Sequence, residues 1–191
     1  MRNDFIIALR NTDHSWGAPA KLLHWAVAAL VFAQLALGWA AVSWRLSPTK
    51  LELFVWHKST GMLIALLMLV RAAWRLANVA PALPVYMRPL ERRAAQLSHF
   101  LLYLLLLLMP LTGWIVTSAS NIPFRVFWLI PIPAIVQPDE AVADAAAGAH
   151  LALFVLLSLL LAVHIGAALR HHLLKRDDVL LRMLPGRRST E

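Results

Sequence analysis

Four stretches of this chain, each about 20 residues long and almost free of charge, constrain its fold more than any other feature. They cover residues 22–42, 53–76, 97–119 and 149–174. Each is long enough to cross a bilayer, and all four are expected to be helices because a lipid-exposed backbone must satisfy its hydrogen bonds within its own segment. Of the 191 residues, 60% are hydrophobic and 15% are charged, whereas soluble domains average roughly 45–50% and about 25%. The sequence therefore predicts an all-α fold, an integral membrane four-helix bundle formed by a single domain over residues 1–191.

Lys and Arg are distributed unequally over the two sides that four spans would create. The side that holds both termini and the 78–94 loop carries Arg2, Arg10, Lys21, Arg71, Arg75, Arg88, Arg92, Arg93, Arg170, Lys175, Arg176, Arg182, Arg187 and Arg188. The other side carries only Arg45, Lys50, Lys58 and Arg125. Because cytoplasmic loops are enriched in Lys and Arg, both termini are predicted to be cytoplasmic. The net charge of +8 is explained by Lys and Arg residues that flank membrane spans, so no nucleic-acid partner is expected.

Two segments outside the four spans, the N-terminus and residues 120–148, could be mistaken for further membrane segments. The N-terminus is not expected to be a cleaved signal peptide, because Asp4, Arg10 and Asp13 interrupt it. The 120–148 segment is apolar in its first half but contains prolines, which break helices. We expect it to lie on the bundle as an interfacial lid on the external side, and not to cross as a fifth helix.

Histidines at the ends of the predicted spans are the main functional signal, because ionisable side chains inside a membrane are costly and usually have a role. His24 and His164 lie near the cytoplasmic ends of the first and fourth spans. His57 and His150 lie near the external ends of the second and fourth spans. On one helix, 14 residues span about 21 Å and return to nearly the same face, so the fourth span can present His150 and His164 together. Depth alone therefore pairs His24 with His164 and His57 with His150.

Two histidine pairs at different depths suit two haems, each held by two axial imidazoles. The chain has no cysteine, which excludes covalent c-type attachment and leaves b-type haem. Six-coordinate iron of this kind favours electron transfer. Zinc is an alternative, but a structural zinc site needs four ligands close together, which residues at opposite depths cannot provide. A lone membrane histidine can also act only as an interhelical hydrogen-bonding residue.

Five stretches of the sequence are similar to one known family. They are LLHW at His24, WHKSTGMLIALLMLVRAAWRL from Trp56, LSHFLLYLLLLLMPLTGWIV from Leu97, HLALFVLLSLLLAVHIGAALRHH from His150, and the tail KRDDVLLRMLP. With them the chain resembles the bacterial diheme cytochrome b561 family, and most closely its superoxide oxidase branch. The spacing of His150 and His164 and the tail are the most specific of these features.

This resemblance implies a four-helix bundle with two b haems in the bacterial inner membrane. The family's axial ligands correspond to His24, His57, His150 and His164. The resemblance further implies a ubiquinone site near the cytoplasmic haem and superoxide as the electron donor on the periplasmic side. The expected activity is that of a superoxide:ubiquinone oxidoreductase. The expected partners are the lipid bilayer, ubiquinone, and superoxide or another periplasmic electron donor.

Two basic residues are further candidates for the site. Lys58, next to His57, is the external cation best placed to attract superoxide, because a positive field raises the on-rate of an anion; the same charge could instead neutralise a haem propionate. Arg71 lies 14 residues after His57 at the cytoplasmic depth. It could bind a propionate through its guanidinium fork or simply extend to the membrane surface.

Two more histidines are candidates at the cytoplasmic end. His99 could donate to a haem propionate or a quinone carbonyl, or pack as an interfacial residue. His171, with His172 beside it, could supply the hydrogen bond and the proton route that quinone reduction needs. Its alternative is a contact with lipid headgroups.

Two other functions stay open from the sequence. The first is a haem-bearing membrane anchor of a larger dehydrogenase or respiratory complex, whose other subunits would dock on the apolar part of the 120–148 segment. The second is a non-redox metal transporter, which would use acidic or Met ligands in the spans. The spans contain no Asp, and Met62, Met68 and Met109 fit ordinary packing, so the transporter is disfavoured.

Overall fold

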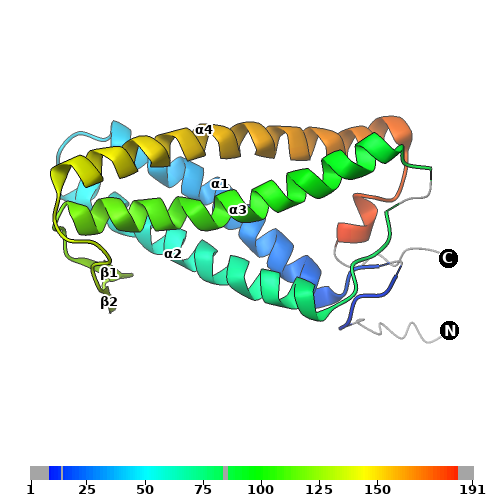
Figure 1. The fold of residues 1–191 in the computed structure, drawn as a ribbon, viewed down its shortest axis with the longest axis horizontal. Helices are drawn as coiled ribbons and strands as arrows, with labels where there is room; N and C mark the ends of the chain where they lie inside the picture. The colour runs from blue at the N-terminus through cyan, green and yellow to red at the C-terminus, as the bar shows by residue number, and fades with distance from the viewer. Residues whose placement is uncertain (1–8, 14, 84–85, 185–191) are drawn as a thin grey trace.

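The computed structural model describes residues 9–13, 15–83 and 86–184. Four long helices form one bundle: α1 (Ala18–Ser43), α2 (Pro48–Ala77), α3 (Pro89–Ala119) and α4 (Glu140–Arg170) (Figure 1). All four are long and apolar enough to cross a membrane. The predicted all-α bundle with four spans is confirmed. The chain termini, and with them Arg2, Arg187 and Arg188, lie outside the described residues.

Each helix extends beyond the apolar stretch that predicted it, because its start is set by capping residues and not by hydropathy. Proline stands in the first turn of α1, α2 and α3, where its missing N–H costs nothing. At α4, the Asp139 carboxylate accepts a hydrogen bond from the backbone N–H of Val142, and an alanine-rich turn follows. Residues 140–148, expected to belong to the external lid, therefore form the first turns of α4.

The rest of the 120–148 segment forms a short antiparallel β-hairpin, β1 (Phe124–Val126) and β2 (Ile130–Ile132). It is fixed to the end of the bundle by two hydrogen bonds: Phe127 N–H donates to Ser59 Oγ at 2.8 Å, and Trp114 Nε1 donates to the Pro133 carbonyl at 2.9 Å. The prediction that this segment does not span is correct. We call this end of the bundle the hairpin end (Figure 1).

The opposite end, which we call the tail end, holds the start of α1 and the end of α4. There α4 continues as a π-helical turn, η1 (His171–Lys175), and a 3₁₀ turn, η2 (Leu181–Met183). The tail folds back onto α1, since Trp25 Nε1 donates to the Met183 carbonyl at 2.8 Å and Lys21 Nζ to the Leu184 carbonyl at 3.2 Å. The C-terminal segment thus covers the tail end of the bundle.

The bundle consists of two closely packed helix pairs, α1 with α2 and α3 with α4, and α2 also contacts α3. Its core is divided accordingly. One cluster, formed by Val27, Val31, Ile64 and Met68, lies between α1 and α2, and a second, formed by Leu102, Leu105 and Leu157, lies between α3 and α4. Over the described residues the backbone of α4 makes few close approaches to α1 or α2, while the Leu161 side chain of α4 packs against the first cluster. The histidines lie between the two helix pairs.

Candidate functional site

At the hairpin end, His57 of α2 faces His150 of α4. Their imidazole centres are 6.3 Å apart and their planes are inclined by 73°. Both rings lie partly inside the bundle. The two residues are distant in the sequence and belong to different helix pairs, so the histidine pair connects the two halves of the bundle.

The His150 ring is held in one orientation by Thr112 of α3. Thr112 Oγ1 lies 2.9 Å from His150 Nδ1 and also donates its own hydrogen to the Met109 carbonyl at 2.9 Å. Because a hydroxyl has one hydrogen, the Thr112 oxygen accepts from His150, and Nδ1 carries the proton. This leaves Nε2 of His150 as the free ligand atom. A hydrogen bond of this kind orients a metal-binding histidine and fixes its tautomer.

His57 is positioned by two residues of α1. Gln34 Nε2 donates to the His57 carbonyl at 2.9 Å and lies 3.3 Å from the ring nitrogen Nε2. A Cβ at Gly38 would come within 2.9 Å of His57 Cε1, closer than real side-chain contacts allow. Glycine at position 38 is therefore what lets α1 approach the imidazole.

At the tail end, His24 of α1 faces His164 of α4, with imidazole centres 6.4 Å apart and planes inclined by 63°. A third histidine, His99 of α3, has its ring centre 5.4 Å from that of His164. Arg71 of α2 is close enough to interact electrostatically with His24, His99 and His164. The structure thus brings together the two pairs that depth had predicted and adds His99 and Arg71 to the tail-end pair.

Arg71 is held inside the bundle by Tyr103 of α3. Its Nε donates to the Tyr103 hydroxyl at 3.0 Å, and its guanidinium lies 5.6 Å from the centre of the same ring. An arginine that only extended to the membrane surface would not make these contacts. Its positive charge is available to a carboxylate beside the tail-end histidines.

The spacing of each histidine pair fits one iron ion between two imidazoles. A metal–nitrogen bond is about 2 Å long and the ring centre lies about 1 Å behind the nitrogen, so two rings on opposite sides of one metal have centres about 6 Å apart. Both measured separations, 6.3 and 6.4 Å, match this value. The buried Nδ1 atoms of His24 and His57 have no hydrogen-bond partner among the described residues, so each of these rings has a nitrogen atom free to bind a metal.

The donor set favours haem over a metal held by protein ligands alone. Within the described part of the chain, no group of three or more His, Cys, Asp or Glu residues is arranged to hold a metal ion. Each pair supplies two ligands, so the remaining positions must come from another molecule. A porphyrin would supply those remaining positions with its own nitrogen atoms.

The cations that the sequence predicts to be external do not form one cluster. Lys58, beside His57, lies with its ammonium 5.7 Å from the centre of the Phe124 ring on the hairpin. Lys50 donates to the Val42 and Trp44 carbonyls at the end of α1, and Arg125 donates to the Leu129 carbonyl within the hairpin. Lys58 therefore differs from Lys50 and Arg125 in two ways. It follows a histidine of the pair in the sequence, and among the described residues it binds no backbone carbonyl.

His171 lies at the first position of η1, buried, with its Nδ1 bonded to the carboxylate of Asp177. Its backbone carbonyl accepts from the N–H groups of Arg176 and Asp177, which closes the turn after α4. The left-handed backbone of Arg176, with φ of 53°, makes this reversal. His171 is thus part of the turn that returns the tail to α1, with Nε2 left for another partner.

Sequence reasoning missed the supporting residues Gln34, Thr112 and Tyr103. Gln34 had a usable signal, since it and His24 are the strongly polar side chains within an otherwise apolar first span. Thr112 and Tyr103 had none, because threonine and tyrosine are ordinary members of a membrane helix. Their role depends on which residues of a neighbouring helix they face.

Comparisons with known proteins identify relatives over almost the whole chain. Residues 15–186 match the family model described as prokaryotic cytochrome b561. Over 97% of its length the chain is 32% identical to cytochrome b561 homolog 2 of Escherichia coli K12, of which 98% is covered. It is 28% identical to a probable superoxide oxidase CybB of Yersinia pestis and to cytochrome b561 homolog 1 of E. coli K12, in each case over 87% of this chain and 94% of the relative.

Proposed function

The chain belongs to the prokaryotic cytochrome b561 family, and we propose that it carries electrons across the membrane from superoxide at the hairpin end to ubiquinone at the tail end. It is a multi-pass electron-transfer protein of the bacterial inner membrane, in a family whose cofactor is b-type haem. The observation that carries the proposal is the presence of two histidine pairs, each with the spacing of a bis-imidazole site, at opposite ends of one bundle.

Two b haems are proposed, one held by His57 and His150 and the other by His24 and His164. When bound, b-type haem supplies a carrier that accepts and releases one electron without binding a further ligand. The protein contributes orientation and charge. Thr112 fixes the His150 tautomer, Gly38 makes room for the His57 ring, and Arg71 places a positive charge beside the tail-end pair.

Superoxide is the proposed donor at the hairpin end, supported by the name of the Yersinia relative and by the position of Lys58. Two superoxide anions each give up one electron and leave as dioxygen. This step transfers no proton, so the protein needs to attract the anion and bring it near the histidine pair. Lys58 follows His57 in α2, and its ammonium, 5.7 Å from the centre of the Phe124 ring, makes no ion pair among the described residues, so it can attract a small anion.

Ubiquinone is the proposed acceptor at the tail end. One ubiquinone takes up two electrons and two protons to become ubiquinol, so this end needs hydrogen-bond donors and a proton route. His99 and His171 are the candidates for both, because an imidazole can donate a hydrogen bond through one nitrogen and relay a proton through the other. Asp177 binds Nδ1 of His171 and so leaves Nε2 available to a quinone carbonyl. The basic residues of the tail end support its assignment to the cytoplasmic side.

A reduced-minus-oxidised visible spectrum with haem quantified per chain tests the cofactor proposal. We expect two b haems in the wild type and one in each of His150→Ala and His164→Ala. A colourless protein, or a haem content that neither substitution changes, would refute the two-haem site.

A second experiment tests the donor and the acceptor. The purified protein is given superoxide in the presence of a ubiquinone analogue, and ubiquinol is measured against a sample that also contains superoxide dismutase. Ubiquinol formation that the dismutase abolishes supports the proposed reaction. Two haems without superoxide-dependent ubiquinol would overturn the proposed superoxide-to-ubiquinone reaction and leave the cofactor proposal standing.

One observation favours a second function, the haem-bearing anchor of a larger dehydrogenase or respiratory complex. The tip of the hairpin carries three exposed apolar residues, Trp128, Leu129 and Ile130, with exposed fractions of 47%, 73% and 61%. An exposed apolar surface of this kind can be a contact site. Purification from the native membrane under mild detergent discriminates the two, because an anchor brings other subunits at a fixed ratio and an independent oxidase does not.

A further inference from the structure

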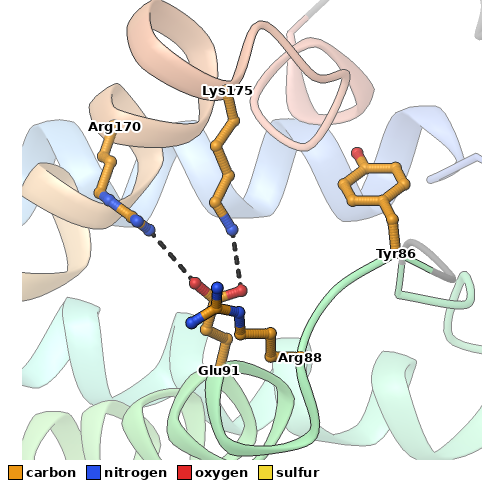
Figure 2. Close-up of a pocket in the computed structure, with 5 residues that line it drawn as sticks. All are labelled: Tyr86, Arg88, Glu91, Arg170 and Lys175. Carbon is orange, nitrogen blue, oxygen red and sulfur yellow. Dashed lines mark hydrogen bonds and ion pairs between the residues drawn. The ribbon is translucent and has the colours of Figure 1, made fainter.

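A cavity of about 380 Å³ opens at the tail end between the start of α3 and the end of α4. Five residues line it: Tyr86, Arg88, Glu91, Arg170 and Lys175 (Figure 2). The volume is at the low end of the range for small-molecule sites, about 300–1,000 Å³, and suits a headgroup rather than a whole lipid. None of these residues has a role in the proposed electron transfer.

The cavity has an excess of positive charge. Glu91 binds one cation from the end of α4 and one from η1, with Oε1 3.4 Å from Arg170 NH1 and Oε2 2.8 Å from Lys175 Nζ. In Figure 2 these two side chains point down toward the carboxylate, and Arg88 lies in front of it. The exposed Arg88 guanidinium has no hydrogen-bond or ion-pair partner among the described residues. The three cations and one carboxylate among the lining residues sum to a formal charge of +2.

The other groups of the cavity also favour an anion with oxygen acceptors. Desolvation and the neighbouring carboxylates of Asp177 and Asp178 raise the pKa of the Tyr86 phenol, so the phenol keeps its proton, with Asp177 within reach as an acceptor. The 31-residue helix α3 begins at Pro89, directly after Arg88, and the N-terminus of a helix adds a positive potential. Arginine binds phosphate through two parallel N–H groups.

The surroundings point to a lipid as the source of the phosphate. The cavity lies where two membrane-spanning helices leave their apolar segments. The same helices carry exposed leucines nearby, among them Leu90, Leu97 and Leu169, with exposed fractions of 78%, 57% and 46%. Acyl chains can lie along such residues while the headgroup enters the basic cavity. Basic pockets between membrane helices on the cytoplasmic side are a known setting for anionic lipids.

We propose that the cavity formed by Arg88, Arg170, Lys175 and Tyr86 binds the phosphate group of an anionic phospholipid. The lipid would connect α3 to α4 at the tail end, next to the salt bridges of Glu91. This inference does not depend on which donor and acceptor the protein uses.

The test is a titration of the purified haem-loaded protein with lipids, followed by native mass spectrometry. The probes are dioctanoyl phosphatidylglycerol, which is anionic, dioctanoyl phosphatidylcholine, which is zwitterionic, and inorganic phosphate. We expect phosphatidylglycerol to bind more tightly than phosphatidylcholine. Arg88→Gln should weaken phosphatidylglycerol binding about fivefold, the effect of one cation near an anionic surface, and leave phosphatidylcholine unchanged.

Arg93→Gln is the matched control, because Arg93 is also exposed on the first part of α3 but does not line the cavity. It should bind both lipids as the wild type does. Glu91→Gln, which removes the competing carboxylate, should bind phosphatidylglycerol more tightly.

Three results would overturn the proposal. Equal affinity for the two lipids would exclude a charge-selective headgroup site. Equal losses in Arg88→Gln and Arg93→Gln would indicate general attraction to a basic surface. Binding of inorganic phosphate as tight as that of phosphatidylglycerol would assign the cavity to free phosphate and not to a lipid.

Discussion

Thr112 Oγ1 of α3 lies 2.9 Å from Nδ1 of His150 on α4, and the hydroxyl hydrogen is already donated to the Met109 carbonyl. The threonine therefore acts as an acceptor and leaves Nε2 of His150 to bind a metal. Through this contact the fold orients the His150 ring and makes its Nε2 available to bind a metal ion.

Thr112→Val keeps the shape of the side chain but removes this acceptor. Because loss of a hydrogen-bond partner behind a metal-binding histidine typically costs about 10–100-fold in affinity, we expect weaker haem binding at the hairpin end. Haem retention during dilution in detergent measures it. Thr117→Val is the control, since the Thr117 hydroxyl donates to the Gly113 carbonyl of its own helix. Equal haem loss in both variants would contradict a specific role of Thr112.

Gly38→Ala should disturb the other histidine of the same pair. The new Cβ would lie 2.9 Å from His57 Cε1, so the ring or the helix must move. We expect partial loss of the hairpin-end haem, measured as haem per chain. Gly166→Ala on α4 is the matched control, because its Cβ meets nothing within 4 Å. That variant should retain both haems and gain up to about 1 kcal/mol in helix stability.

Arg71→Gln should lower the reduction potential of the tail-end haem. Removal of a positive charge beside His24 and His164 makes the addition of an electron less favourable. If the lost interaction is about 1 kcal/mol, the shift is about 40 mV. Redox titration of the visible spectrum measures it. Tyr103→Phe, which removes the hydroxyl bonded to Arg71 Nε but keeps the arginine, should shift the potential less. A potential that Arg71→Gln leaves unchanged would exclude a role for its charge.

Lys58→Gln should slow superoxide-dependent ubiquinol formation and reduce the dependence of its rate on ionic strength. Both effects follow if the ammonium beside His57 attracts the anion, because salt screens such attraction. Lys58→Arg keeps the charge and should restore most of the rate. The haem spectrum of all three proteins serves as the control. A rate that is equally low in Lys58→Arg would show that the ammonium acts by geometry and not by charge.

The turn of the hairpin contains two aromatic residues in the left-handed conformation, Phe127 with φ of 47° and Trp128 with φ of 62°. Such backbones cost about 1–3 kcal/mol for non-glycine residues. Trp128→Gly relieves this strain but removes the contact between Trp128 and Trp56, whose ring centres are 5.4 Å apart. An aromatic pair contributes about 0.5–1.5 kcal/mol beyond the apolar area that it buries, and Trp128 is only 47% exposed, so we expect a net loss of thermal stability. A gain, measured by thermal unfolding in detergent, would show that the strain outweighs the aromatic contact.

The sequence alone determined the four spans and the depth of each histidine. Hydropathy reports which segments must leave water, and a histidine inside such a segment stands out because its cost is high. Positions along a helix axis can be read from residue numbers, and for this reason the pairs His24–His164 and His57–His150 could be predicted.

Tertiary structure decided the neighbours of these residues. A helix between lipid and an apolar interior is apolar on every side, so its sequence carries no period that tells which face meets which helix. The contacts of Gln34 with His57, Thr112 with His150 and Tyr103 with Arg71 depend on the rotation and spacing of the helices. The start of α4 at Glu140 was likewise set by the cap at Asp139, outside the reach of hydropathy. The depth of each histidine in the membrane therefore follows from the hydrophobic effect on its helix, and the side-by-side arrangement of the helices follows from how they pack.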